Sequence, residues 1–264
     1  MCWNITAKAQ FGGGLGTESS PYEIYTKAHL EELADSVNNS EPYPADNWSK
    51  GKFFKVMNDI NEPVTKMIGN RNYNFQGNFN GQNYKIKLNI VGLNSFGTAL
   101  FVYIRGATIF NVIVNGNVKG KGSVGGIVGG IVGEADSSVI FNSVNLANIE
   151  GEYHFVGGII GFIMNNCVVH FCLNLGSVVG EGFCSCVGGV VGHSGNHPYD
   201  GTNSNIVSFC KNAGYIKGYQ AVSGIVGHLG RHSDNSNTIV FQCFNVGVIE
   251  VEIENTNGGI TYVD

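Results

Sequence analysis

The 264-residue chain is poor in charge and in proline. Charged residues make up 13% of it and prolines number 5, whereas glycines number 39. A composition rich in glycine, valine, isoleucine and asparagine favours strands joined by tight turns over helices. The net charge of −5 and the lack of any Lys/Arg-rich run argue against a nucleic-acid partner, because neutralising phosphates needs clustered cations.

Several signatures of catalysis and of membrane insertion are also absent. No stretch of the sequence approaches the ~20 apolar residues of a transmembrane helix. The segment VGGIVGGIVG (124–133) has the composition of a phosphate-binding loop, but no lysine follows Gly133 as a P-loop requires. Neither an H-E-x-x-H zinc-protease motif nor a D-x-[DN]-x-[DN]-G calcium loop occurs. We therefore expect no cofactor and no transmembrane segment.

The first nine residues resemble the end of a secretory signal peptide. Ala7-Lys8-Ala9 precedes Gln10, and small residues at these two positions are what a signal peptidase reads. The upstream MCWNI is too short for a hydrophobic region, so residues 1–9 are interpreted as the remnant of a longer signal. A chance A-x-A match is the alternative. This interpretation predicts an exported protein.

Residues 10–97 are predicted to form an N-terminal capping region with one helix and the first strands. The helix is expected over about 27–37, with Thr26 as its N-cap and Asn38-Asn39 as its stop. Its apolar residues follow the i, i+3, i+4, i+7 spacing of one helical face: Leu30, Leu33, Ala34 and Val37.

From residue 98 to 264 the chain repeats itself. One motif, typified by VGGIVG, places its first glycine or serine at positions 125, 157, 188, 223 and 258, which gives a period of 31–35 residues. A second motif lies between these copies and carries one asparagine in each: Asn145, Asn174, Asn212 and Asn245. Two interleaved motifs with one period are the signature of a repeat architecture.

This pattern predicts an all-β fold, a parallel β-helix (β-solenoid) with about 31–35 residues per repeat. Stacking in register, at ~4.8 Å per rung, would align the four asparagines in a ladder with amides bonded along the stack. The predicted helix would cover the open N-terminal edge. The chain ends at GGITYVD as a new repeat begins, so we expect the repeats to be truncated at the C-terminus and further domains to follow in the native chain.

Three of the seven cysteines occupy one column of the repeat. Cys172, Cys210 and Cys243 each stand two residues before a ladder asparagine, and Ser143 takes that place in the earlier copy. Buried thiols are predicted, because the ~4.8 Å rung spacing exceeds the ~3.5–4.5 Å Cβ separation of a disulfide. Disulfides remain an alternative in an exported protein. The pair Cys184-Ser185-Cys186 lacks the C-x-x-C spacing of a zinc or redox site.

Residues 11–264 resemble the GLUG-motif repeat family of bacterial secreted and cell-surface proteins. The likeness rests on GGIVG followed by the N-x-G-x-I-x-G pattern, and on GTESSPYEIYTKAHLEELADSVN, KFFKVMNDI and FQGNFNGQNYKI before the repeats. The resemblance implies a bacterial protein that is secreted or displayed on the cell surface, with an adhesion or stalk role. It offers no catalytic residues to carry over.

Paired histidines give one candidate site. His193 and His197 in GHSGNH stand at the same place in the repeat as His228 and His232 in GHLGRH. Four imidazoles in adjacent loops, followed by two aspartates, can ligate Zn²⁺ or Ni²⁺. Because repeat ancestry and polar loop composition explain the pattern without a metal, no metal site is predicted and the four histidines are kept as candidates.

Aromatic and acidic residues give two further hypotheses. Three aromatic residues follow the last glycine of successive repeats and would either stack on sugar rings or plug a corner of the solenoid, which is favoured: Tyr153, Phe183 and Tyr219. Glu150 and Glu250 share a repeat column, but two intervening rungs separate them, and no cluster of acid, lysine and arginine is visible in the sequence. No catalytic residue is therefore predicted.

These observations favour a non-catalytic module that binds a glycan or an extracellular protein, or serves as a stalk. The alternative is a glycan-active β-helix enzyme, a polysaccharide lyase or hydrolase, which for hydrolysis needs acids ~5–9.5 Å apart. Binding to ice or crystal surfaces would need a flat threonine ladder, and no threonine column is visible.

Overall fold

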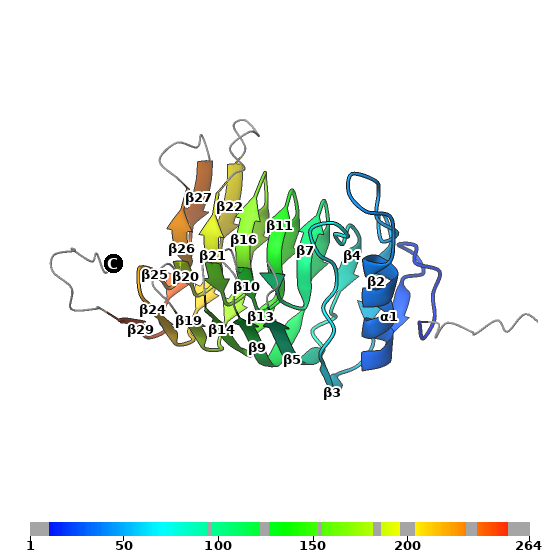
Figure 1. The fold of residues 1–264 in the computed structure, drawn as a ribbon, viewed down its shortest axis with the longest axis horizontal. Coiled ribbons are helices and arrows are strands. Elements are labelled where there is room, and N and C mark those ends of the chain that lie inside the picture. Colours follow the sequence, from blue (N-terminus) through cyan, green and yellow to red (C-terminus); the bar gives the residue numbers. More distant parts are fainter. Residues whose placement is uncertain are drawn as a thin grey trace, which may run out of the picture.

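The protein is a stack of short parallel strands, a β-solenoid of about six turns. The computed structural model describes residues 11–93, 97–121, 127–152, 155–181, 186–195, 204–230 and 237–252. Successive turns lie side by side along the long axis in Figure 1, with the N-terminal helix at one end. The predicted fold class is confirmed.

The strands of the solenoid form four sheets, which we call A to D. Sheet A has eight strands in the order β1-β2-β4-β8-β12-β17-β22-β27. Their bounds are Tyr22–Ile24, Phe53–Val56, Asn78–Asn80, Thr108–Phe110, Val139–Phe141, Val168–His170, Ser204–Ser208 and Asn237–Phe241. Every pairing in this sheet is parallel, and the sheet runs without a break from the N-terminal strands into the repeats.

Sheet B has eleven strands, because each turn contributes two short strands to it or one long one. The long strands are β5 and β9, which pair with each other over nine residues. The bounds are Ile60–Val64 (β3), Lys85–Leu93 (β5), Ile113–Lys121 (β9), Val144–Asn145 (β13), Asn148–Gly151 (β14), Leu173–Asn174 (β18), Val178–Gly180 (β19), Lys211–Asn212 (β23), Ile216–Gly218 (β24), Phe244–Asn245 (β28) and Ile249–Val251 (β29).

Sheets C and D have five strands each. In three turns a glycine pair joins a strand of sheet D to the next strand of sheet C: Gly129-Gly130, Gly157-Gly158 and Gly188-Gly189. Ser223-Gly224 takes this place in the last turn, and the first turn has Ala99-Leu100 between the two strands. Sheet C consists of Phe101–Arg105 (β7), Val132–Asp136 (β11), Ile160–Met164 (β16), Val191–Ser194 (β21) and Val226–Leu229 (β26). Sheet D consists of Gly97–Thr98 (β6), Ile127–Gly129 (β10), Phe155–Gly157 (β15), Cys186–Gly188 (β20) and Ala221–Ser223 (β25).

The interior is filled by columns of β-branched side chains, as the repeat pattern predicts. One column in sheet A consists of Ile109, Ile140, Val169 and Val207, all fully buried. A column in sheet B consists of Val118, Ile149, Val178 and Ile216, likewise buried. Each column puts like side chains one rung apart, where their branched faces pack tightly against one another.

The predicted helix closes the N-terminal end of the stack. Helix α1 spans Lys27–Asn38, and the side chain of its N-cap Thr26 accepts a hydrogen bond from the His29 amide at 3.3 Å. All four residues of the predicted apolar face are buried in the common core: Leu30, Leu33, Ala34 and Val37. Among the described residues this is the single helix, and none is long and apolar enough to span a bilayer.

The asparagine ladder is present, and it explains why the two repeat motifs occur together. In each rung the Asn Nδ2 donates to the Oδ1 of the next Asn at 2.7–2.8 Å, and the same Nδ2 reaches the backbone oxygen two residues on. The second glycine of each pair packs against this amide. A Cβ on Gly158 would lie 2.6 Å from Asn174 Oδ1, so a glycine is required where the ladder touches the corner.

The register of the first repeat differs from the prediction. Gly129, not Gly125, pairs with Gly157 and through it with Gly188 and Ser223. Position 125 lies outside the described residues. Rung offsets also extend beyond 31–35: Val132 pairs with Ile160, 28 positions on, and Val168 with Ile206, 38 positions on. Strands keep their register while connections between them vary in length, so the offset is not fixed.

The predicted cysteine column is confirmed as thiols. Cys172 and Cys210 are buried and Cys243 is half-buried, and none of the described cysteines is in a disulfide. Cys210 Sγ accepts a hydrogen bond from the Cys172 amide, and Cys243 Sγ accepts one from the Cys210 amide, each at 3.4 Å. In the earlier turn Ser143 Oγ accepts from the Val112 amide at 3.2 Å. The thiols therefore act as hydrogen-bond acceptors for backbone amides at this corner.

Candidate functional site

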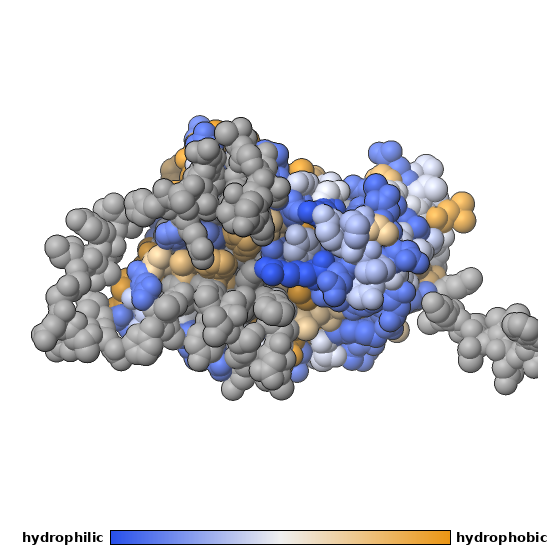
Figure 2. Space-filling model, turned by 45° about the horizontal axis from the view of Figure 1, so that its top comes forward, coloured by the Kyte–Doolittle hydropathy of each residue, from blue (hydrophilic) through white to orange (hydrophobic). Residues whose placement is uncertain are grey.

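One column of sheet C carries a polar or aromatic residue in every rung. Successive rungs place Tyr103, Glu134, Phe162, His193 and His228 in register. We call this column the C-ladder. Because parallel strands stack without stagger, five residues spread over 126 positions of sequence become neighbours at ~4.8 Å intervals. In Figure 2, hydrophilic residues predominate toward the N-terminal end of the molecule.

The N-terminal end of the C-ladder opens into a pocket of about 620 Å³. Its lining includes Arg71, Tyr103 and Glu134, together with Asn38, Asn70 and Asn72. Arg71 binds Glu134 through Nε and Nη2, each 3.1 Å from Oε2. The guanidinium is about half exposed while the carboxylate is almost buried, so the pair presents its cationic end to the pocket.

The buried Glu134 also affects its neighbour on the ladder. Burial raises the pKa of Tyr103 well above its usual value, and the charges of Glu134 and Asp136 raise it further. The phenol is therefore neutral across the physiological range and can act as a hydrogen-bond donor to a bound group.

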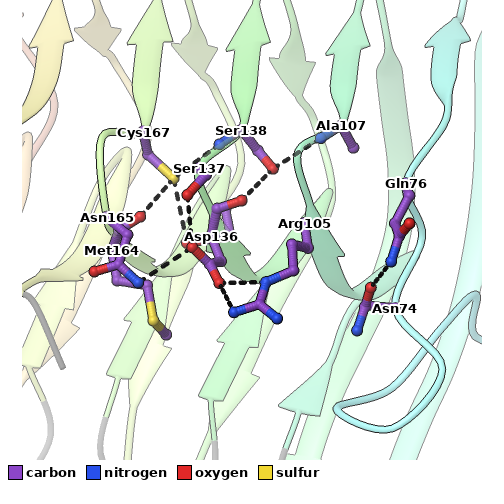
Figure 3. A network of polar contacts seen from close by, with 11 residues as sticks. Asn74, Gln76, Arg105, Ala107, Asp136, Ser137, Ser138, Met164, Asn165 and Cys167 are labelled. Carbon is purple, nitrogen blue, oxygen red and sulfur yellow. Dashed lines mark hydrogen bonds and ion pairs between the residues drawn. The ribbon is translucent and has the colours of Figure 1, made fainter. Parts of the chain in front are cut away.

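A second ion pair lies at the corner between sheets C and A (Figure 3). Arg105 donates through Nε and Nη2 to the same Asp136 oxygen at 2.7 Å, and its guanidinium stacks 4.3 Å from the Tyr43 ring. The other Asp136 oxygen accepts from Ser137 Oγ at 2.9 Å and from Asn165 Nδ2 at 3.2 Å. With both oxygens hydrogen-bonded, Asp136 stabilises the corner.

No cluster of acids and arginines is visible in the sequence, but the structure brings two acid–arginine pairs together. Arg71 and Glu134 are 63 positions apart, and Arg105 and Asp136 are 31 apart. No local spacing rule connects the first pair, because Arg71 lies in a connection of the N-terminal region. The repeat period does indicate the second pair, because Arg105 and Asp136 are 31 positions apart and lie in register on neighbouring strands.

At the other end of the C-ladder, three side chains of types that can ligate a metal lie close together. The ligating atoms of Cys186, His193 and His228 all lie within 4.8 Å of one another. The two Nδ1 atoms are 3.0 Å apart, and the rings are stacked with centroids 4.9 Å apart. Sequence reasoning brought these two histidines together correctly. It missed Cys186 as a partner, since only the fold-back at the glycine pair between sheets D and C sets Cys186 beside His193.

The remaining predicted site residues are placed less completely. His197, His232, Tyr153 and Phe183 lie outside the described residues. Tyr219 is half-buried, and its hydrogen bond to Glu252 raises its pKa.

The predicted acidic column of sheet B is present. Glu150, Val179, Lys217 and Glu250 follow one another in register, and each glutamate pairs with a lysine, Glu150 with Lys119 and Glu250 with Lys217. The two glutamates are three rungs apart, ~14 Å along the stack, which exceeds the separation that a glycosidase pair needs.

Comparisons with known proteins add the fold but no family. No family model matches the chain, and no curated protein matches it. One solved structure is similar, that of a "putative immunoglobulin A1 protease" from Bacteroides ovatus. The two share 15% sequence identity with a TM-score of 0.50, over 92% of this chain and 86% of that one. At this identity the likeness establishes a common β-solenoid architecture and nothing about activity.

Proposed function

We propose that this chain is a non-catalytic, glycan-binding repeat module of a bacterial secreted or cell-surface protein, with adhesion as its role. The observation that carries the proposal is the pocket at the N-terminal end of the C-ladder. There Arg71, Tyr103 and Glu134 form a polar lining beside three asparagines.

The chemistry of this lining suits a saccharide. Sugar hydroxyls need donors and acceptors at fixed positions, which amides, a guanidinium and a carboxylate provide. The Arg71–Glu134 pair holds both groups in place, so little side-chain entropy is lost on binding. Phe162 follows Glu134 on the ladder and gives the polar pocket an aromatic continuation, along which an extended chain would lie.

Export and surface display also belong to the proposal. They are supported by the Ala7-Lys8-Ala9 sequence and by the resemblance to GLUG-motif repeats. The structure gives a physical reason for the co-occurrence of the glycine pair and the asparagine in the repeat. The second glycine of the pair packs against the amide of the ladder asparagine, so a larger residue at the glycine would displace that amide from its hydrogen bonds.

A hydrolytic enzyme is the second candidate, favoured by the buried Glu134 beside Tyr103 and by the name of the similar Bacteroides protein. The proposal ranks it lower because Glu134 is ion-paired with Arg71. The acid next to it along the strand, Asp136, is already bound by three side chains. A protease acting on an immunoglobulin would make a protein, not a glycan, the ligand of this surface.

A glycan array followed by calorimetry tests the proposal. We expect a saccharide hit whose affinity falls at least tenfold, or about 1.4 kcal/mol, in Arg71→Ala and in Glu134→Gln. Lys50→Ala is the matched control, since Lys50 is an exposed cation paired with Asp46 and lies outside the pocket lining.

Three results would contradict the proposal. Binding that is unchanged in both pocket variants would move the site elsewhere on the molecule. Binding to extracellular proteins but to no glycan would make the module a protein-binding one. Mass spectrometry showing turnover of a glycan or immunoglobulin substrate, lost in Glu134→Gln, would establish the enzyme instead.

A further inference from the structure

We propose that Cys186, His193 and His228 form a zinc site in which a water molecule completes the coordination. The three side chains come from three strands: Cys186 from β20 of sheet D, and His193 and His228 from neighbouring strands β21 and β26 of sheet C. Their ligating atoms already lie within 4.8 Å of one another.

The distances are close to those of a tetrahedral zinc centre. Zinc binds cysteine sulfur at about 2.3 Å and histidine nitrogen at about 2.0–2.1 Å, so ligand atoms in a tetrahedral site are about 3.3–3.6 Å apart. The two Nδ1 atoms are 3.0 Å apart, and no separation in the cluster exceeds 4.8 Å. Side-chain rotations that move the donor atoms by about 1 Å would complete the geometry, without a change of backbone.

The surroundings hold His193 in the orientation that the site needs. Its ring is stacked on Phe155 at 4.3 Å and on Phe162 at 5.2 Å, and the residue is only 6% exposed. A Cβ built on Gly195 would lie 3.0 Å from His193 Nε2, so this nitrogen faces the backbone at Gly195 while Nδ1 faces His228. A ring fixed in this way loses little freedom when a metal binds.

The identity of the donors selects the metal. One thiolate and two imidazoles form a borderline-soft set, which suits Zn²⁺ and its spectroscopic substitute Co²⁺, whereas Mg²⁺ and Ca²⁺ require oxygen ligands. With three protein ligands the fourth position is left to water or to a bound group. The competing explanation is that the two imidazoles share one hydrogen bond and Cys186 packs beside them.

Titration of the full chain with Co²⁺ and then Zn²⁺ tests this site. We expect one Co²⁺ per chain, with the visible bands of tetrahedral Co²⁺ and a thiolate-to-cobalt charge-transfer band in the near ultraviolet, both removed by Zn²⁺. His228→Ala and Cys186→Ser are the informative variants, because His228 is exposed and Cys186 is half-buried, so both can be changed with less risk to folding than His193. Each should weaken Zn²⁺ binding by more than about 100-fold, since the loss of even a supporting residue costs about 10–100-fold.

Two matched controls keep the result interpretable. His170→Ala removes an imidazole that bonds Ser208, and Cys243→Ser removes a half-buried thiol, and neither residue belongs to the cluster. Both controls should keep the spectrum and the affinity. Circular dichroism of the metal-free variants confirms that they are folded.

Either of two results would overturn the assignment. Absence of the charge-transfer band with wild-type protein would leave the histidine–histidine hydrogen bond as the explanation. A site lost in His197→Ala or His232→Ala but intact in Cys186→Ser would place the metal among the four histidines. The glycan experiment uses Glu134, two rungs from His193 along the C-ladder, and its ion-pair partner Arg71, and neither belongs to the metal cluster, so the two proposals fail independently.

Discussion

Replacing Asn174 by alanine should destabilise the solenoid far more than the same change at Asn245. Asn174 is fully buried in the middle of the asparagine ladder. Its Nδ2 donates to Gly176 O at 3.1 Å and to Asn212 Oδ1 at 2.7 Å, and its Oδ1 accepts from Asn145 Nδ2 at 2.8 Å. Alanine removes these three hydrogen bonds.

The magnitude follows from what is left behind. A buried polar group that loses its partner costs about 1–3 kcal/mol, and a typical net hydrogen bond contributes about 1 kcal/mol. Two of the three former partners keep a weaker bond, at 3.1 Å for Asn145 Nδ2 and 3.3 Å for Asn212 Oδ1. We therefore expect the free energy of unfolding to fall by about 3–5 kcal/mol. At Asn245, which is exposed, water replaces the lost bonds and the loss should be near 1 kcal/mol.

Urea unfolding followed by circular dichroism and by tryptophan fluorescence measures both variants, and coincident transitions would justify a two-state treatment. If Asn174→Ala costs less than about 1 kcal/mol, or no more than Asn245→Ala, the buried hydrogen bonds of the ladder do not stabilise the fold.

Three further predictions concern the corners of the solenoid. Gly158→Ala should prevent folding, because the added Cβ would lie 2.3 Å from a backbone oxygen of the next rung. Gly51 has a φ of +69° and no atom within 4 Å of an added Cβ, so Gly51→Ala should cost only about 1–2 kcal/mol of backbone strain. Thermal unfolding of both variants measures the difference. Arg105→Met should lower the free energy of unfolding by about 3–5 kcal/mol by leaving the Asp136 carboxylate buried without its cation, and a double-mutant cycle with Asp136→Asn should recover part of that loss. Burial raises the pKa of the Cys167 thiol to about 12 in the folded protein, against about 8.5 in the unfolded chain. The stability that the neutral thiol contributes is therefore complete below about pH 8.5 and is lost as the pH rises toward 12. Measurements of Tm against pH for wild type and Cys167→Ala test this.

Each of these has a result that contradicts it. A soluble, cooperatively unfolding Gly158→Ala protein would show that the corner can open to admit a methyl group. A cycle with no coupling between Arg105 and Asp136 would mean that the corner is held by the other contacts in Figure 3. The same alkaline decline of Tm in both proteins would assign the effect to groups other than Cys167.

The repeat architecture could be predicted because its determinants are local and recur. Each ladder asparagine, column cysteine and buried valine appears once per turn, so its spacing along the chain reports its place in the stack. The helix was predictable for the same reason, since its four buried residues follow one periodicity. Parallel stacking in register then converts a sequence period directly into spatial contact.

Other features of the protein depend on tertiary structure, because they join residues that no repeat period relates. The doubled segment 124–133 offers two equally good glycine pairs, and only pairing with Phe155–Gly157 selects Gly129 as the register position. The Arg71–Glu134 pair joins a connection of the capping region to a repeat strand, so no spacing announces it. Cys186 reaches His193 because the glycine pair folds sheet D back against sheet C, a contact within one turn that the comparison of successive turns does not reveal. The sequence by itself therefore determined the ladders, because they follow the repeat, while the pocket and the Cys–His cluster depend on how the corners bring different columns together.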